Sequence, residues 1–487
     1  MSARLKLANV NTHVVDILGS VKGRDQPVMK MDKAVELVKC LEEEVFINED
    51  YVFFDPFCKA GEILLATALV TSLYKSKNKP VLLDTVYKEM YQSDRYFALA
   101  PDERHYNLSL RTFYGNEKSH DKNFTENIKN GGYLSEMDGR LDEEKFNKEL
   151  KAMLEYIKEK TGSKNVVAVG NPPYQENYKG TNNNTGANPI YHFLLDSLII
   201  NRQIDQFVMV IPSRWFSGGR GQSLKRFASQ LKKSKKIKQI YDFENSKVVF
   251  PTVDIKGGVC FLHWSSKYNG KTLFYNCENN EKTTVDLSKS DIIVRDRFSR
   301  SIVEKINKKS KRYISEIAWS WNPFGLSSNY FDKHPECKTG DLIDCFTKRK
   351  IKMRIKKSKI GKNRDKVNTY KVACPKAVRT GGVPYRENQI FIMNPKQICT
   401  ESYMVIDTFK SQNDAKRFLN YLNTNFVRFL VSVKKITQDI TKDTWSLVPN
   451  LSMNKDKIWT DEKLSKYFSF TKEEQKYIKE QVKKWTA

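Results

Sequence analysis

An asparagine, two prolines and a tyrosine stand together at Asn171–Tyr174, directly after the apolar run NVVAVG (165–170). Proline fixes its own backbone torsion and has no N–H, so two successive prolines make this peptide rigid and remove two donors. What remains is the Asn171 amide, backbone carbonyls that can accept, and one aromatic face. This set suits a planar group that carries an amine, because two oxygens accept from the NH₂ while the ring stacks. The alternative is a rigid turn with a packed tyrosine.

A second short peptide, DPFCKAG (55–61), ends the apolar run YVFFDP (51–56) and precedes the helical pattern GEILLATALVTSLY (61–74). A turn of small residues between a strand and a helix lets a ligand approach the backbone closely, and the helix N-terminus helps to hold polar groups. Taken alone, a single glycine in such a position also fits an ordinary tight turn. Cys58 is interpreted as a small packing residue of this turn.

The elements that must position these two peptides alternate between strands and helices from about Tyr51 to Trp264. The apolar runs expected to be strands are residues 51–56, 95–101, 165–170, 206–212, 237–243 and 257–264, and helical patterns such as 188–199 lie between some of them. This alternation predicts an α/β fold with an open, mostly parallel sheet. Ligands bind such sheets at the carboxyl ends of the strands, where both peptides fall. The last two runs follow each other without room for a helix, so we expect an antiparallel edge there.

Together, the two peptides and their order resemble the γ class of S-adenosylmethionine-dependent adenine-N6 DNA methyltransferases. Residues 21–41 and 208–264 also resemble segments of this class, and residues 420–451 are similar to the tail of Eco57I-like restriction-modification methylases. The resemblance implies a Rossmann-like methyltransferase sheet, S-adenosyl-L-methionine as cofactor and double-stranded DNA as substrate. It also implies that the protein is the modification component of a restriction system, and a separate restriction endonuclease subunit stays open as a further partner.

The resemblance assigns roles residue by residue. The residues implied to act on the target base are Asn171, Pro172, Pro173, Tyr174 and Phe250, the last as a second aromatic wall or, alternatively, as a core phenylalanine. The residues implied to bind the cofactor are Gln26, Pro27, Asp55, Pro56, Phe57, Cys58, Ala60, Gly61, Asp102 and Asn171. The chain departs from the family pattern at Lys59 and Ala60, where many relatives carry Gly and Ser, and at Gln26, where threonine is usual. The candidates for the acidic ribose ligand are Asp102 and Glu103.

The implied reaction is a direct methyl transfer to the exocyclic nitrogen of an adenine that has left the duplex. The Asn171 oxygen and the Pro172 carbonyl would accept the hydrogens of the amine, and Tyr174 would stack on the base. Cytosine-C5 methylation needs a thiolate, usually presented in a Pro-Cys dipeptide, and no Pro-Cys occurs in the chain. Cytosine-N4 methylation uses a similar pocket, usually with Ser in place of Asn, and is a close alternative. A methyltransferase that acts on RNA or on a protein glutamine also stays open, as does a DNA-binding restriction subunit with a vestigial cofactor site.

The charge balance favours a polyanionic partner. Lys and Arg number 84 against 57 Asp and Glu, which gives a formal net charge of +27. The densest basic stretch, KRKIKMRIKKSKIGKNRDK (348–366), holds eleven Lys or Arg and one acidic residue. It predicts contacts with DNA phosphates, and the candidate residues are Lys348, Arg349, Lys350, Lys352, Arg354, Lys356 and Lys357. A solvated loop is the alternative interpretation.

We expect residues 1–266 to form the cofactor-binding catalytic domain and residues 267–487 to form a mixed α+β target-recognition domain that ends in helices. The eight cysteines lack metal-ligand spacing, so we expect no metal site and a reducing compartment. The N-terminus has no apolar core of a secretion signal, and no apolar run reaches membrane-spanning length. The sequence therefore predicts a soluble cytoplasmic protein that does not bind a membrane.

Overall fold

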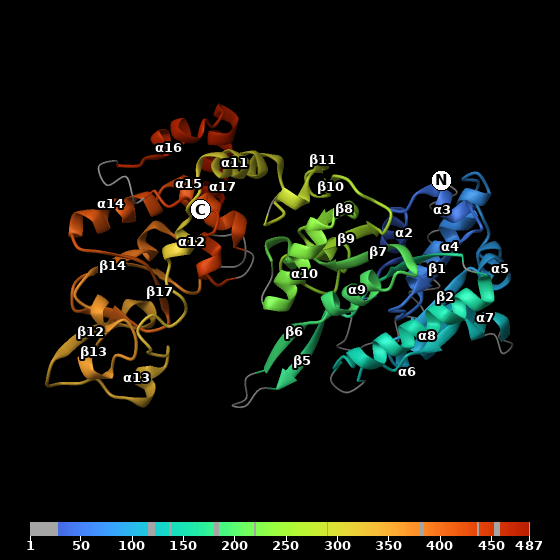
Figure 1. Cartoon of the computed structure of the whole chain (residues 1–487), viewed down its shortest axis with the longest axis horizontal. Helices are drawn as coiled ribbons and strands as arrows, with labels where there is room; N and C mark the ends of the chain where they lie inside the picture. Colours follow the sequence, from blue (N-terminus) through green and yellow to red (C-terminus); the bar gives the residue numbers. More distant parts are fainter. Residues whose placement is uncertain are drawn as a thin grey trace. The chain divides into compact units, whose positions relative to one another are not determined.

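The structure of the chain is a computed structural model, drawn in Figure 1. It describes residues 28–114, 122–135, 139–162, 164–179, 185–218, 221–289, 291–378, 384–435, 438–451 and 458–486. The predicted cofactor ligands Gln26 and Pro27 lie outside these ranges. The chain divides into two compact units, one ending at Ile293 and the other beginning at Val294.

The first unit is built on a nine-stranded sheet with the order β11-β10-β8-β9-β7-β4-β1-β2-β3. Its strands are β1 (Tyr51–Asp55), β2 (Tyr96–Ala100), β3 (Ile128–Asn130), β4 (Asn165–Gly170), β7 (Ile204–Pro212), β8 (Ile237–Phe243), β9 (Val259–Ser265), β10 (Thr272–Asn276) and β11 (Glu281–Val285). All run parallel except β9 and β11. The predicted open, mostly parallel α/β sheet is confirmed.

The reversed strand does not lie at the edge of the sheet, where it was predicted. β8 and β9 pair antiparallel as expected, but β9 also pairs with β7 and therefore lies inside the sheet. β9 is a mostly apolar strand, and six of its seven residues are buried. Such a strand suits the middle of a sheet, where helices cover both faces. The edge is formed by β11, which is antiparallel to β10 and only partly buried. Because β10 and β11 complete this sheet, the unit extends to Ile293 and does not end at residue 266.

Helices cover both faces of the sheet, since successive side chains of a strand point to opposite sides. On one face the core combines Phe53 of β1 with side chains of α2 (Met31–Val38), α3 (Glu43–Ile47), α4 (Glu62–Lys75), α5 (Leu83–Gln92), α6 (Glu103–Tyr114) and α7 (Lys122–Glu126). On the other face Val52 and Phe54 pack with α8 (Glu143–Thr161), α9 (Tyr191–Ile200) and α10 (Gln222–Lys233). Figure 1 shows a hairpin of β5 (Gln175–Lys179) and β6 (Thr185–Pro189) standing off from this sheet.

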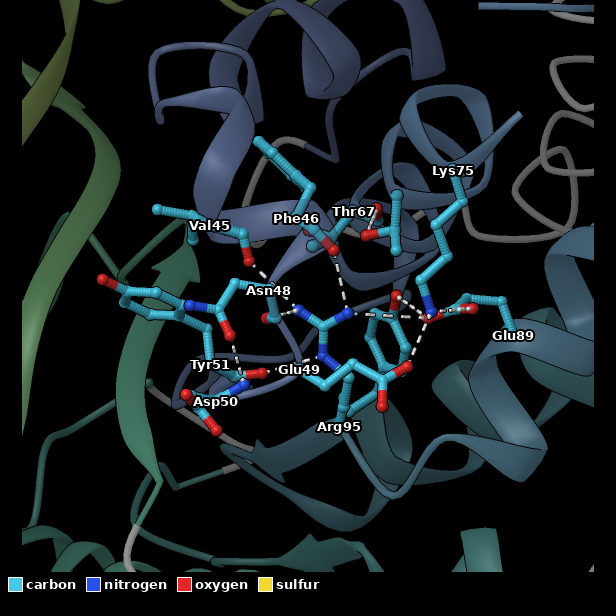
Figure 2. Close-up of polar contacts among 12 residues, drawn as sticks. Val45, Phe46, Asn48, Glu49, Asp50, Tyr51, Thr67, Lys75, Glu89 and Arg95 are labelled. Atoms are coloured by element: carbon cyan, nitrogen blue, oxygen red, sulfur yellow. Dashed lines mark hydrogen bonds and ion pairs between the residues drawn. The ribbon is translucent and has the colours of Figure 1, made fainter. Parts of the chain in front are cut away.

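A buried arginine fixes the amino ends of the first two strands. Figure 2 shows the Arg95 guanidinium surrounded by backbone carbonyls: it donates to Tyr51 O (2.8 Å), Phe46 O (2.8 Å), Val45 O (3.0 Å) and Asn48 O (3.0 Å). The side chain is 1 % exposed. Because one residue donates to four carbonyls of α3, the following turn and the start of β1, it fixes the position at which β1 begins.

The second unit is a mixed α+β structure with two three-stranded sheets, β13-β12-β16 and β15-β14-β17. Its strands are β12 (Leu342–Phe346), β13 (Lys352–Lys356), β14 (Tyr370–Pro375), β15 (Phe391–Met393), β16 (Gln397–Cys399) and β17 (Tyr403–Phe409). Its helices are α11 (Arg297–Lys309), α12 (Ile314–Ile317), α13 (Tyr330–Lys333), α14 (Gln412–Leu422), α15 (Asn425–Lys434), α16 (Asp461–Phe468) and α17 (Lys472–Thr486). Across the described residues of both units, no helix is long and apolar enough to cross a membrane.

Candidate active site

The two peptides singled out in the sequence lie side by side in the structure. β1 pairs in parallel with β4, so Asp55 and Gly170 end neighbouring strands at the same edge of the sheet. A Cβ added to Gly170 would lie 2.8 Å from Asp55 Oδ1, which is shorter than the contacts that Cβ atoms make with other heavy atoms in proteins. The contact between the two strand ends therefore requires a glycine at position 170. Two segments that are about a hundred residues apart in the sequence thus lie together at the carboxyl edge of the sheet.

The turn after β1 is fixed by one carboxylate and one glycine. The buried Asp55 accepts from the Phe57 N–H (3.0 Å), and burial raises the pKa of this carboxyl well above its usual range. Gly61 precedes α4 with a left-handed φ of 78°. A Cβ on Gly61 would lie 2.6 Å from the Phe113 ring. Both the backbone conformation and the close contact therefore demand glycine at this position.

The other predicted residues of the turn pack inward. Pro56, Cys58 and Ala60 are all buried. The Pro56 carbonyl accepts from the Tyr133 hydroxyl (2.8 Å), and the Cys58 N–H donates to Leu99 O (3.1 Å). Burial raises the pKa of the Cys58 thiol well above its usual range, so the thiol keeps its proton. This agrees with a packing role for Cys58 and not with a nucleophilic one.

Lys59 lies in this site but was not among the residues predicted to bind the cofactor or the target base. It is 3 % exposed, and its ammonium lies 5.7 Å from the centre of the Tyr174 ring, which joins the two peptides through one side chain. Burial lowers the pKa of Lys59 to about 7, against the attraction of the Glu62 and Asp55 carboxylates. Lysine is rarely buried, so sequence alone predicts exposure. The one sequence feature that pointed to Lys59 is that many members of the family that this chain resembles carry glycine at this position.

The Asn-Pro-Pro-Tyr peptide is held against the end of the sheet. Residues 171–173 are buried and Tyr174 is half-buried. The Tyr174 hydroxyl donates to Val210 O (3.3 Å), and its ring meets that of Phe250 edge-on, with centroids 6.4 Å apart at 74°. Phe250 is 1 % exposed and belongs to the hydrophobic core on this face. It is therefore both an aromatic neighbour of Tyr174 and a core residue.

The candidate ribose ligand Asp102 lies just after β2 and is engaged within the protein. Its Oδ1 accepts from the His105 N–H (2.8 Å) and its Oδ2 lies 2.7 Å from His105 Nδ1. Although burial opposes ionisation, these His105 contacts lower the pKa of Asp102, so the carboxylate is charged. The alternative, Glu103, is exposed in the first turn of α6. A ribose would have to share Asp102 with His105.

The end of a fourth strand at the same edge was not predicted. β3 is only three residues long and pairs in parallel with β2, so its last residue, Asn130, lies at the carboxyl edge. The Asn130 side chain accepts from the Gly132 N–H (3.1 Å). The sequence Ile-Lys-Asn has no strand periodicity, and the Asn-Gly-Gly turn of residues 130–132 was the only local signal.

The basic segment 348–366 lies in the second unit and is partly a β-strand. β13 alternates the exposed Lys352, Arg354 and Lys356 with the more buried Met353 and Ile355, and pairs antiparallel with β12. The remaining candidates, Lys348, Arg349, Lys350 and Lys357, are exposed at the two ends of this strand. β13 is an edge strand of its sheet, and cations also protect such edges from pairing with other chains.

The first unit is thus an α/β structure whose mostly parallel sheet has one reversed inner strand and carries polar and glycine residues at its carboxyl edge. Residues 94–250 match the Eco57I restriction-modification methylase family. This segment contains the Asn-Pro-Pro-Tyr peptide and ends at Phe250.

The chain is also similar to an uncharacterized adenine-specific methylase of Mycoplasma pneumoniae (strain ATCC 29342 / M129 / Subtype 1). The two are 35 % identical over 131 residues, which are 26 % of this chain and 30 % of that relative. The match thus spans less than a third of the relative's length.

Two solved structures resemble the chain at low identity. The type IIL restriction-modification enzyme MmeI in complex with DNA gives a TM-score of 0.47 and 11 % identity, over 98 % of this chain and 74 % of that one. The DrdV–DNA complex gives a TM-score of 0.48 and 10 % identity, over 89 % of this chain and 56 % of that one.

Proposed function

We propose that this protein is a site-specific DNA methyltransferase that transfers a methyl group from S-adenosylmethionine to N6 of an adenine flipped out of duplex DNA. We further propose that it serves as the modification component of a restriction system, with the second unit, residues 294–487, contributing target recognition. One observation carries the proposal: the Asp55–Gly61 turn and the Asn171–Tyr174 peptide meet at the carboxyl ends of two neighbouring parallel strands. Ligands bind open α/β sheets at this edge.

The chemistry of the donor set fits the cofactor. Two buried carboxylates, Asp55 and Glu62, flank the turn, and only one buried cation, Lys59, lies between them. Burial raises the pKa of both carboxyl groups, and a positively charged ligand would favour their ionised forms. When bound, the cofactor supplies a methyl group on a positively charged sulfur. The residues that would hold it are those of the turn, together with Asp102 and Asn171.

The Asn-Pro-Pro-Tyr peptide supplies what an exocyclic amine needs in order to react. The lone pair of adenine N6 is delocalised into the ring, so the nitrogen is a poor nucleophile. The Asn171 side-chain oxygen and the Pro172 carbonyl would accept its two hydrogens and free the lone pair. Because Asn171 is 1 % exposed, water competes little for these contacts. Tyr174, half-buried and anchored through its hydroxyl, would stack on the extruded base.

Cofactor binding is expected to depend on pH through Lys59. The pKa of Lys59 is about 7, so the amine is mostly charged at pH 6 and mostly neutral at pH 8. A charged amine repels the sulfonium, so affinity for S-adenosylmethionine should rise about tenfold over this range. Isothermal titration at both pH values measures this change.

Two controls isolate the residue and the charge. Lys59→Met should bind with nearly the same affinity at both pH values. S-adenosylhomocysteine lacks the positive sulfur, so its binding to the wild type should vary less with pH. Equal pH dependence in wild type and Lys59→Met would exclude Lys59 as the titrating group.

The exposed cations after the β12–β13 turn are expected to contact DNA phosphates. Replacing Lys352, Lys356 and Lys357 with Gln should weaken DNA binding and reduce the slope of log affinity against log salt by roughly 2.7, at 0.9 per contact. A matched variant with Gln at Lys148, Lys151 and Lys158 removes the same charge from α8 and should change the slope little. An unchanged slope in the first variant would leave edge protection as the role of these lysines.

The proposal is tested by offering the purified protein three acceptors with tritium-labelled S-adenosylmethionine: unmethylated duplex DNA, RNA and a mixture of cellular proteins. We expect label in duplex DNA. Label in RNA or protein instead would favour a methyltransferase for one of those substrates. DNA binding without transfer to any acceptor would favour a DNA-binding restriction subunit with a vestigial cofactor site.

A further inference from the structure

The β12–β13 hairpin of the second unit carries an unusual turn at its tip, residues 347–351. The Ile351 N–H donates to Lys348 O (3.3 Å) and closes a four-residue turn. Its two central residues, Arg349 (φ 59°, ψ 25°) and Lys350 (φ 60°), are both left-handed. This is the conformation of a type I′ hairpin turn, in which Asn-Gly is strongly preferred.

Arg and Lys are poor choices for these backbone positions. A side chain with a Cβ is strained at positive φ, whereas Asn-Gly forms the same turn at little cost. Strained backbone of this kind is concentrated at ligand-binding positions. The tip therefore keeps two long cationic side chains at a place where stability alone favours small residues.

The two cations of the tip have different surroundings. Lys350 is tied to its own unit: its N–H donates to the Tyr403 hydroxyl (2.8 Å), and its ammonium donates to Asn388 O (2.7 Å) and lies 4.6 Å from the centre of the Phe391 ring. Arg349 is exposed, and within the described part of the chain its guanidinium has no hydrogen-bond or ion-pair partner. Lys350 thus anchors the tip while Arg349 is presented to solvent at its apex.

The residues beside Arg349 suit the floor and rim of a DNA groove. Ile351 is 56 % exposed, an uncommon setting for a large apolar side chain. Lys352 and Lys356 are exposed on the strand that leads away from the tip. A two-stranded ribbon fits the major groove, where an arginine fork pairs with O6 and N7 of guanine and apolar groups contact the thymine methyl. Edge protection explains the strand lysines but not an exposed isoleucine beside a strained, unengaged arginine.

We infer that the β12–β13 hairpin reads duplex DNA in the major groove and that Arg349 sets sequence specificity by pairing with a guanine. Lys352 and Lys356 would then hold the ribbon to the flanking phosphates, and Lys350 would keep the tip rigid. This inference rests on the proposed DNA methyltransferase function and adds to it the element and the residue that select the target sequence.

The test is to express the wild type, Arg349→Gly, Arg349→Lys and Lys352→Gln in a host without DNA methylation and to map every modified base by sequencing. Arg349→Gly removes the guanidinium but relieves the strained backbone, so the protein should be at least as stable as the wild type in thermal unfolding. We expect the wild-type motif to contain a G·C pair that Arg349→Gly no longer discriminates, with a loss of roughly 5- to 150-fold at that position alone. Arg349→Lys should lose most of this discrimination, because it lacks the planar fork.

The outcomes separate this inference from the proposed function. Lys352→Gln should lower methylation evenly at the unchanged wild-type motif, as a phosphate contact does. If Arg349→Gly also methylates the unchanged motif, at a lower or an equal level, Arg349 does not read a base and the inference fails while the methyltransferase function stands. If the wild type modifies no base, the proposed function itself fails.

Discussion

Asn171→Ala is expected to lower the rate of methyl transfer by about 10²–10³-fold, the usual effect of removing one preorganised polar contact to a reacting group. The change deletes the side-chain oxygen that accepts from the target amine and leaves the Asp55–Gly61 turn and the second unit in place. Affinities for S-adenosylmethionine and for DNA should therefore stay near those of the wild type. Single-turnover transfer of labelled methyl groups measures the rate, and titrations of cofactor and DNA measure binding.

Tyr174 provides the matched comparison, because it belongs to the same peptide but has a different role. Tyr174→Ala removes the stacking face and should weaken retention of the flipped base, seen as a smaller rise in 2-aminopurine fluorescence at the target position. Tyr174→Phe removes only the hydroxyl that donates to Val210 O and should keep much of the activity. A wild-type rate in Asn171→Ala would reduce Asn-Pro-Pro-Tyr to a rigid turn.

Arg95→Met is expected to lower the free energy of unfolding by about 3–5 kcal/mol, as removal of one partner from a buried charged network does. Four backbone carbonyls each lose the hydrogen bond from Arg95, and the buried Met cannot replace it. Urea denaturation followed by circular dichroism measures the loss. Arg111→Met on the exposed side of α6 serves as the control and should change stability by well under 1 kcal/mol. Similar stability of the two variants would show that the four carbonyls do not depend on Arg95.

The parts of the fold that could be predicted are those with strong local patterns. β1 and β4 are continuous apolar runs because parallel central strands are buried on both faces, so their ends, and the peptides that follow, could be placed from sequence. β3 could not, because three residues carry no period. The order of the strands could not either, and β9 was expected near an edge although its apolar sequence suits an inner position.

The candidate site shows the same limit. The residue types of Asn171–Tyr174 indicate their chemistry directly, whereas Lys59 becomes a site residue only because the fold buries it and brings its ammonium to Tyr174 of the other peptide. The basic segment was expected either to contact phosphates or to be a solvated loop. The alternation Lys-Met-Arg-Ile-Lys at 352–356 is typical of a β-strand, but the high charge of the segment favoured a loop. The left-handed turn at Arg349 has no sequence pattern that predicts it and is seen only in the backbone torsions.

The most direct test of the central claim is the nucleoside composition of DNA from a methylation-free host that expresses this protein. Mass spectrometry of the digested DNA should find N6-methyladenine with the wild type and almost none with Asn171→Ala at equal protein levels. Finding N4-methylcytosine in its place, or no modified nucleoside with a folded wild-type protein that binds S-adenosylmethionine, would contradict the assignment of adenine N6 as the methylated atom.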